Sequence, residues 1–245
     1  MALVLREDKE GIAVLTLNRP EHLNAMNPQV FVELRAHLDA IAADLNGVGC
    51  VILTGAGKSF SAGNDLRAIA ARERAPTPHF QAETIDALEA LPQPTICVVR
   101  GHCYTGGMEL MLGCDFLIAS DTARFCDTHG KFGMVPLWGL TQRLPRRVGL
   151  MRAKEMSLTG RVVPGEEAVS IGLATMCVPD AELETRAMAY ARMIVANSWH
   201  SARGNKQLYQ QSQQGDLASG LSHERYKGPG VAPDMAERVA SFGRK

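Results

Sequence analysis

The residue types best suited to chemistry lie in the segment 98–110, where the adjacent glycines Gly106 and Gly107 follow an apolar run and precede a helical pattern. Residues without a Cβ atom let a ligand approach the backbone closely. The first N–H groups of a helix have no partner within the helix, and they carry partial positive charge. This combination predicts a backbone site that stabilises negative charge developing on an oxygen atom.

Two acidic residues accompany the predicted backbone site. Glu109 lies three residues after Gly106, so its side chain is expected near the face that carries the Gly106 amide. A glutamate in the first turn of a helix is more commonly a partner of the helix dipole than a catalyst. The loop 60–66 enters another helix at Asp65, whose carboxylate is suited to capping that helix.

The bulk composition limits the classes of function. The chain of 245 residues is 46% hydrophobic and 21% charged, with a formal net charge of zero, as in an ordinary soluble globular protein. This neutral balance argues against a dedicated nucleic-acid binder. A local cluster of Arg143, Arg146 and Arg147 allows two interpretations, a phosphate contact or a solvated helix end.

The sequence also indicates the cellular environment. The N-terminal segment lacks the apolar stretch of a secretory signal, and no apolar run reaches the length of a membrane span. The six cysteines lie mostly inside apolar runs without C-x-x-C spacing, which favours reduced thiols over disulfides or a zinc site. We therefore expect a cytoplasmic protein with no membrane segment and no metal.

Short apolar strands alternate with helices in the first part of the chain. The expected strands are 11–17, 50–54, 95–99 and 115–119, with a helix over 28–45. After about Gly139 the pattern is helical, with one further strand over 174–178 and helices at 152–158, 165–171, 183–195, 201–213, 218–226 and 235–242. This pattern predicts a parallel sheet covered on both faces, followed by a mostly helical region.

Several segments, in their order and spacing, resemble the enoyl-CoA hydratase/isomerase (crotonase) superfamily. The resemblance covers nearly the whole chain and rests on segments 18–26, 60–66, 106–109, 113–115, 136–144, 158–160 and 168–173. It implies an α/β crotonase (ClpP-like) fold, in which repeated ββα units form a twisted sheet core followed by a helical C-terminal region. It further implies a core over 1–190 and a trimerisation region over 191–245, assembled as a homotrimer or a dimer of trimers.

The same resemblance implies an acyl-CoA thioester substrate, with coenzyme A as part of the substrate and no separate cofactor. The backbone N–H groups of Asn64 and Gly106 would form the oxyanion hole that holds the thioester oxygen. Losing one such donor typically costs about 10²–10³ in rate. The coenzyme A arm is expected to pass along His22, Leu23, Ala62, Asp65, Leu66 and Arg67.

Hydratases of this family use two glutamates to position and activate water, and a positioned acid or base contributes on the order of 10²–10⁴. The first matches Glu109, but the position of the second holds His129. An imidazole, with an ordinary pKa of about 6.5, can act as acid or base near neutrality. Alternatively, His129 only fills the pocket. Asp127 either orients His129 or serves solubility.

These features together predict a trans-2-enoyl-CoA hydratase of fatty acid metabolism. The enzymatic alternative is another reaction on the same enolate, either double-bond isomerisation or hydrolysis of a carbon–carbon bond. The alternative from a different class is a catalytically degenerate acyl-CoA-binding protein. Phe132 and Trp138 are large where smaller residues are common, and we expect them to narrow the acyl pocket.

Overall fold

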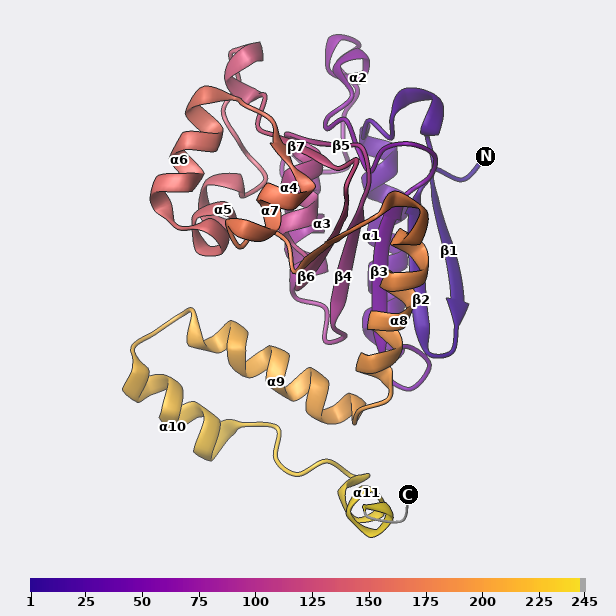
Figure 1. The fold of residues 1–245 in the computed structure, drawn as a ribbon, viewed down its shortest axis with the longest axis vertical. Coiled ribbons are helices and arrows are strands. Elements are labelled where there is room, and N and C mark those ends of the chain that lie inside the picture. The colour runs from indigo at the N-terminus through magenta and orange to yellow at the C-terminus, as the bar shows by residue number, and fades with distance from the viewer. Residues whose placement is uncertain (243–245) are drawn as a thin grey trace.

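A six-stranded sheet forms the centre of the protein in the computed structural model, which describes residues 1–242 (Figure 1). The first two strands pair antiparallel, and every later neighbour in the sheet is parallel. In spatial order the strands are β1 (Val4–Lys9), β2 (Ile12–Leu17), β3 (Cys50–Gly55), β4 (Thr95–Val99), β6 (Phe116–Ser120) and β9 (Met176–Val178).

The central strands are apolar along their whole length because helices cover both faces of the sheet. Helix α8 (Leu183–Val195) packs on one face, against side chains such as Ile52, Ile96 and Ile118. Helices α1 (Pro28–Ala43) and α3 (Phe80–Glu89) contribute to the core on the other face, with neighbours such as Leu53. The continuous apolar runs in the sequence therefore reflect burial on two sides.

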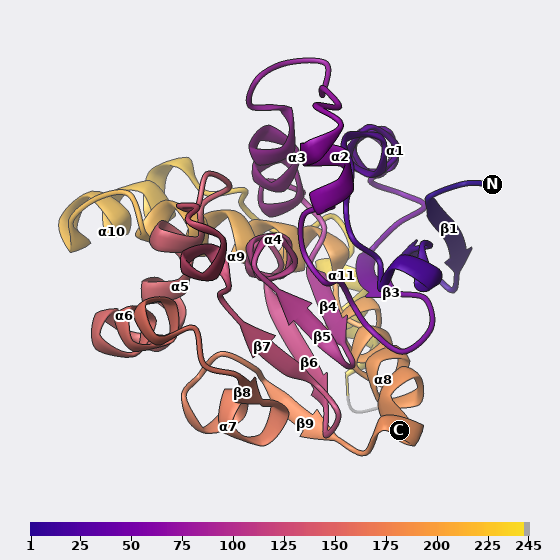
Figure 2. The same cartoon turned by 90° about the horizontal axis from the view of Figure 1, so that it is seen from above.

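A second, three-stranded sheet consists of β5 (His102–Tyr104), β7 (Arg124–Cys126) and β8 (Val163–Pro164). The chain repeats one unit, a long strand in the large sheet, a short strand in the small sheet, and then helical structure. Two such units are β4–β5–α4, with α4 at Gly106–Leu112, and β6–β7 followed by the 3-10 turn η2 (His129–Phe132). This arrangement confirms the predicted ββα core, and Figure 2 shows α4 between the small sheet and helices α3 and α5.

The predicted strands and helices are confirmed with small shifts at their ends. The helices after residue 139 are α5 (Leu140–Val148), α6 (Leu150–Thr159), α7 (Gly165–Ser170), α8, α9 (Trp199–Ser212), α10 (Leu217–Lys227) and α11 (Met235–Ser241). Helices α3 and α5 and strands β1, β5, β7 and β8 were not predicted. Strand β1 is an exposed, polar edge strand, and the strands of the small sheet have only two or three residues, too few to show a periodicity. All six cysteines are free thiols, and five are buried.

Helices α9, α10 and α11 lie below the two sheets (Figure 1). Lys206 binds helix α9 to the body of the protein: its Nζ lies 2.8 Å from Asp115 Oδ2 and 3.0 Å from the Gln93 carbonyl oxygen. The division of the chain after residue 190 stays a prediction, and α8 continues across this position to Val195. No helix among residues 1–242 is both long and apolar enough to cross a lipid bilayer.

Candidate active site

Two loops lie side by side at the upper end of the large sheet, and they carry the residues expected along coenzyme A. The Ala62 N–H donates to the Leu23 carbonyl at 2.9 Å, and the Met26 N–H donates to the Gly63 carbonyl at 2.8 Å. The Asp65 N–H then donates to the Met26 carbonyl at 3.0 Å. These bonds bring the segments around His22 and Arg67 together, although more than forty residues of chain separate them.

Asp65 is a helix cap, as its position in the sequence predicts. Its Oδ1 accepts from the Arg67 N–H at 3.0 Å, at the start of α2 (Leu66–Ala70). Its other oxygen lies 2.9 Å from the Arg19 guanidinium. Burial would raise the pKa of Asp65, but the hydrogen bonds from Arg19 and from the helix N–H groups hold this pKa below its ordinary value. The Leu66 and Arg67 side chains that follow, and the His22 side chain, are exposed.

The backbone N–H groups of Asn64 and Gly106 lie close together because Gly63 has no side chain. Gly63 has a φ of +100°, and a Cβ there would lie 2.8 Å from the Tyr104 carbonyl oxygen and 3.4 Å from the Gly106 nitrogen. A Cβ on Gly106 would lie 3.3 Å from the Asn64 nitrogen. Within residues 1–242 neither N–H donates to a protein acceptor. The two loops therefore place two backbone N–H groups close together.

Glu109 is buried in the first turn of α4, with 1% of its surface exposed. Its Oε1 accepts from the Trp138 N–H at 2.8 Å and from the Leu140 N–H at 3.3 Å. These bonds fix one carboxylate oxygen and leave Oε2 facing His129. Burial raises the pKa of Glu109, against the opposing effects of His129 and of the two N–H groups. The sequence did not reveal these two backbone donors.

His129 lies between two carboxylates. Its Nδ1 is 2.7 Å from Asp127 Oδ1, and its Nε2 is 3.7 Å from Glu109 Oε2. The same Asp127 oxygen accepts from the His129 backbone N–H at 3.0 Å. Burial would raise the pKa of Asp127, but the hydrogen bonds from His129 hold it below its ordinary value. Only 3% of Asp127 is exposed, so it fixes the ring of His129 and does not serve solubility.

The two large residues expected to narrow the pocket differ in their positions. The Trp138 ring lies against Gly106: a Cβ on that glycine would be 2.5 Å from a ring carbon. The ring also packs edge-on against Phe31 at 5.0 Å between centroids. Phe132, in contrast, is 55% exposed, so of the two only Trp138 lies against the Gly106 backbone, and the narrowing of the acyl pocket stays a prediction.

The arginine cluster is engaged within the protein. Arg143 contacts Asp86 and Glu89 on α3, each at 2.6 Å. Arg147 donates to backbone carbonyl groups at the start of β6, and Arg146 donates to the Gln142 carbonyl at 2.6 Å. These contacts favour the interpretation of a helix end over a phosphate site.

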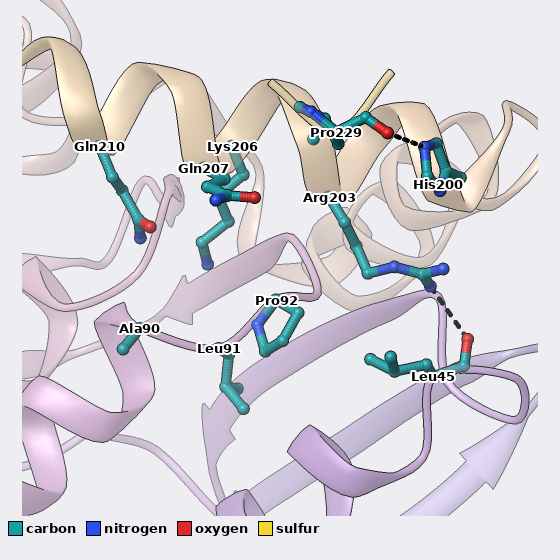
Figure 3. A pocket seen from close by; sticks show the side chains of 11 residues that line it. Leu45, Ala90, Leu91, Pro92, His200, Arg203, Lys206, Gln207, Gln210 and Pro229 are labelled. Atoms are coloured by element: carbon teal, nitrogen blue, oxygen red, sulfur yellow. Dashed lines mark hydrogen bonds between the residues drawn. The ribbon is translucent and has the colours of Figure 1, made fainter. Parts of the chain in front are cut away.

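A separate crevice of about 320 Å³ lies between α9 and the body (Figure 3). Two of its polar side chains have partners within the protein: Arg203 donates to the Leu45 carbonyl at 2.9 Å, and His200 lies 3.3 Å from the Pro229 carbonyl. None of the expected site residues lines it. In the described part of the chain, no group of three or more His, Cys, Asp or Glu side chains is arranged to hold a metal ion.

Comparisons with known proteins show the family to which the chain belongs. The family model described as enoyl-CoA hydratase/isomerase matches residues 7–226. A probable enoyl-CoA hydratase of Mycobacterium bovis is 37% identical, with 99% of this chain and 95% of the relative covered. A short-chain-enoyl-CoA hydratase of Clostridium acetobutylicum is 36% identical, with 89% and 85% covered. The crystal structure of an enoyl-CoA hydratase from Bacillus anthracis superimposes with a TM-score of 0.94 at 33% identity, with 99% and 96% covered. The chain therefore belongs to the enoyl-CoA hydratase/isomerase family and has the crotonase fold.

Proposed function

We propose that this enzyme is a trans-2-enoyl-CoA hydratase, which reversibly adds water across the double bond of an acyl-CoA thioester. One observation carries the proposal: the buried Glu109 carboxylate faces the His129 ring at 3.7 Å, beside two backbone N–H groups with no protein acceptor within residues 1–242. Addition of water to a conjugated thioester requires an acid–base pair to transfer protons and hydrogen-bond donors to stabilise the enolate oxygen.

In the proposed reaction the thioester oxygen accepts hydrogen bonds from the N–H groups of Asn64 and Gly106. Glu109 removes a proton from water while the water oxygen bonds to the β-carbon of the substrate. The electrons of the double bond move onto the thioester oxygen, and the two N–H groups stabilise this enolate. Protonation of the α-carbon then completes the addition of one water molecule.

His129 is the proposed proton donor to the α-carbon. Asp127 holds Nδ1, so Nε2 is the nitrogen that faces the reaction. The Glu109 carboxylate lies 3.7 Å from this nitrogen, so the proposed base and the proposed proton donor face the same space. His129 thus replaces a second glutamate in function as well as in position.

Substrate binding needs no separate cofactor in this proposal. Coenzyme A lies along the paired loops at His22, Leu23, Ala62, Asp65, Leu66 and Arg67, where the backbone supplies most contacts. The Trp138 ring, which lies against Gly106, restricts the space beside the thioester and favours short acyl chains.

Isomerisation and carbon–carbon bond hydrolysis would use the same enolate. The Glu109–His129 pair favours hydration, since it offers one group to activate water and another to protonate carbon. Burying a carboxylate costs free energy because the charge is desolvated. A degenerate acyl-CoA binder would not need such a group, whereas a catalyst would.

We further propose a cytoplasmic homotrimer, alone or as a dimer of trimers. Helices α10 and α11 carry exposed apolar side chains, among them Leu217, Tyr226 and Val239, and Phe242 follows α11. Apolar surface of this kind is typical of an interface between protein chains. We expect residues 191–245 to contribute to it, and masses from light scattering would test this assembly.

The conjugated thioester absorbs in the ultraviolet, so hydration of crotonyl-CoA is followed as a loss of that absorbance. The wild-type enzyme should give this loss, and Glu109→Gln should slow it by about 10²–10⁴. The substituted amide keeps an oxygen for the two N–H groups and removes a charge that burial disfavours, so the melting temperature should not fall. Tight binding without turnover at any chain length would contradict the proposal.

A further inference from the structure

Thr105, the residue before Gly106, has a backbone conformation that β-branched residues rarely adopt. Its φ is +48° and its ψ is −108°, a region in which glycine is the usual residue. Such conformations persist only where the surrounding contacts hold them, and they are concentrated at functional sites. A side chain is therefore kept at a position where glycine would be less strained.

The contacts of Thr105 explain why a side chain is present. The Thr105 hydroxyl is hydrogen-bonded to the Thr128 hydroxyl, and it accepts from the Thr128 N–H at 3.3 Å. The Thr105 N–H donates to the carbonyl of Cys126, at the end of β7, at 2.9 Å. Thr105 is buried, so water competes little for these bonds. Glycine would keep the backbone bond and lose both bonds of the hydroxyl.

These contacts join the two parts of the site over a short path. Gly106, which follows Thr105, carries one of the two oxyanion donors. Asp127 and His129 flank Thr128 on either side. A change in the backbone conformation of either threonine would therefore move the Gly106 N–H relative to the His129 imidazole. A misplacement of about 1 Å between reacting groups can cost on the order of 10² in rate.

We propose that Thr105 and Thr128 are positioning residues, whose hydroxyl bridge sets the Gly106 N–H and the His129 ring at the separation that hydration requires. This inference rests on the proposed function. Neither threonine touches the reacting atoms, so each acts through its neighbour in the chain.

The test compares variants that differ by the hydroxyl alone. Thr105→Val and Thr128→Val keep the branched shape and remove the bridge, whereas Thr105→Ser and Thr128→Ser keep the hydroxyl. For crotonyl-CoA hydration, each valine variant should lower kcat by about tenfold or more, with little change in KM. Each serine variant should recover most of that loss. The double valine variant should be no slower than the slower single variant, because both remove one bridge.

Thr105→Gly separates positioning from folding. Glycine adopts a positive φ freely, so this variant should keep its melting temperature while its kcat falls as in Thr105→Val. Additive losses in the valine variants, serine variants as slow as the valine variants, or a Thr105→Gly enzyme with wild-type kcat would each overturn the inference. A wild-type enzyme without hydration would instead refute the proposed function, so the two failures are distinguishable.

Discussion

The two halves of the site are built from different kinds of group. The half that we propose to bind the thioester oxygen consists of backbone N–H groups at Asn64 and Gly106, which the absent side chain of Gly63 allows to approach. The half that we propose to move protons consists of side chains, Glu109 and His129, fixed by further contacts. One half is therefore set by chain conformation, and the other by residue identity.

This difference has a consequence for how such a site changes during evolution. Substituting a side chain in the oxyanion half leaves the N–H donors in place as long as the loops keep their path. Substituting a side chain in the proton half changes the group that transfers the proton, for example from a carboxylate to an imidazole. We propose that His129 is such a replacement, and Asp127 Oδ1 lies 2.7 Å from its Nδ1.

The largest effect is expected from breaking the proton half. His129→Ala should lower kcat by about 10²–10⁴, because it removes the proton donor. It should also shift the pH dependence, since activity needs ionised Glu109 and is lost as pH falls through the Glu109 pKa. Burial already raises this pKa above its ordinary value of 4.5, and His129 opposes the rise. Without His129 the loss at acid pH should therefore move to higher pH.

The rate of crotonyl-CoA hydration, measured across pH for both enzymes, checks this prediction. Asp127→Asn is a useful companion variant, because it keeps the shape of the side chain and removes the charge that holds His129. Wild-type turnover in His129→Ala, with the same acid limb, would contradict the pairing of Glu109 with His129.

A smaller loss is expected from removing one donor of the oxyanion half. Asn64→Pro lacks the N–H group, whereas Asn64→Ala keeps it and alters only the side chain. The proline variant should be about 10²–10³ slower than the alanine variant in kcat/KM. Melting temperatures of both variants control for damage to the loop. Equal rates in the two variants would show that the Asn64 N–H does not contact the thioester oxygen.

The smallest effect concerns the choice of substrate. Trp138→Ala should improve kcat/KM for a longer enoyl-CoA relative to crotonyl-CoA by about tenfold, because space opens beside Gly106. Phe132→Ala is the matched control, since Phe132 is exposed and should leave the ratio unchanged. An unchanged ratio in Trp138→Ala would place the acyl chain elsewhere.

The fold was largely predictable from the sequence, and the oxyanion half stays a prediction. Amphipathic helices have a strong periodicity, the central strands appear as continuous apolar runs, and the glycines before Glu109 indicate a close approach to the backbone. The short strands β5, β7 and β8 gave no such signal. The Trp138 and Leu140 N–H groups that bind Glu109 are backbone donors from a distant segment, so they cannot be recognised from the residue types. The role of Asp127 became clear only from its burial and its bond to His129.

The mass of the product formed from crotonyl-CoA tests the central claim most directly. Hydration through Glu109 and His129 predicts a product heavier by one water molecule, with one carbon-bound deuterium at the α-carbon when the reaction runs in heavy water. A product of unchanged mass, or unchanged substrate bound to the protein, would contradict the account.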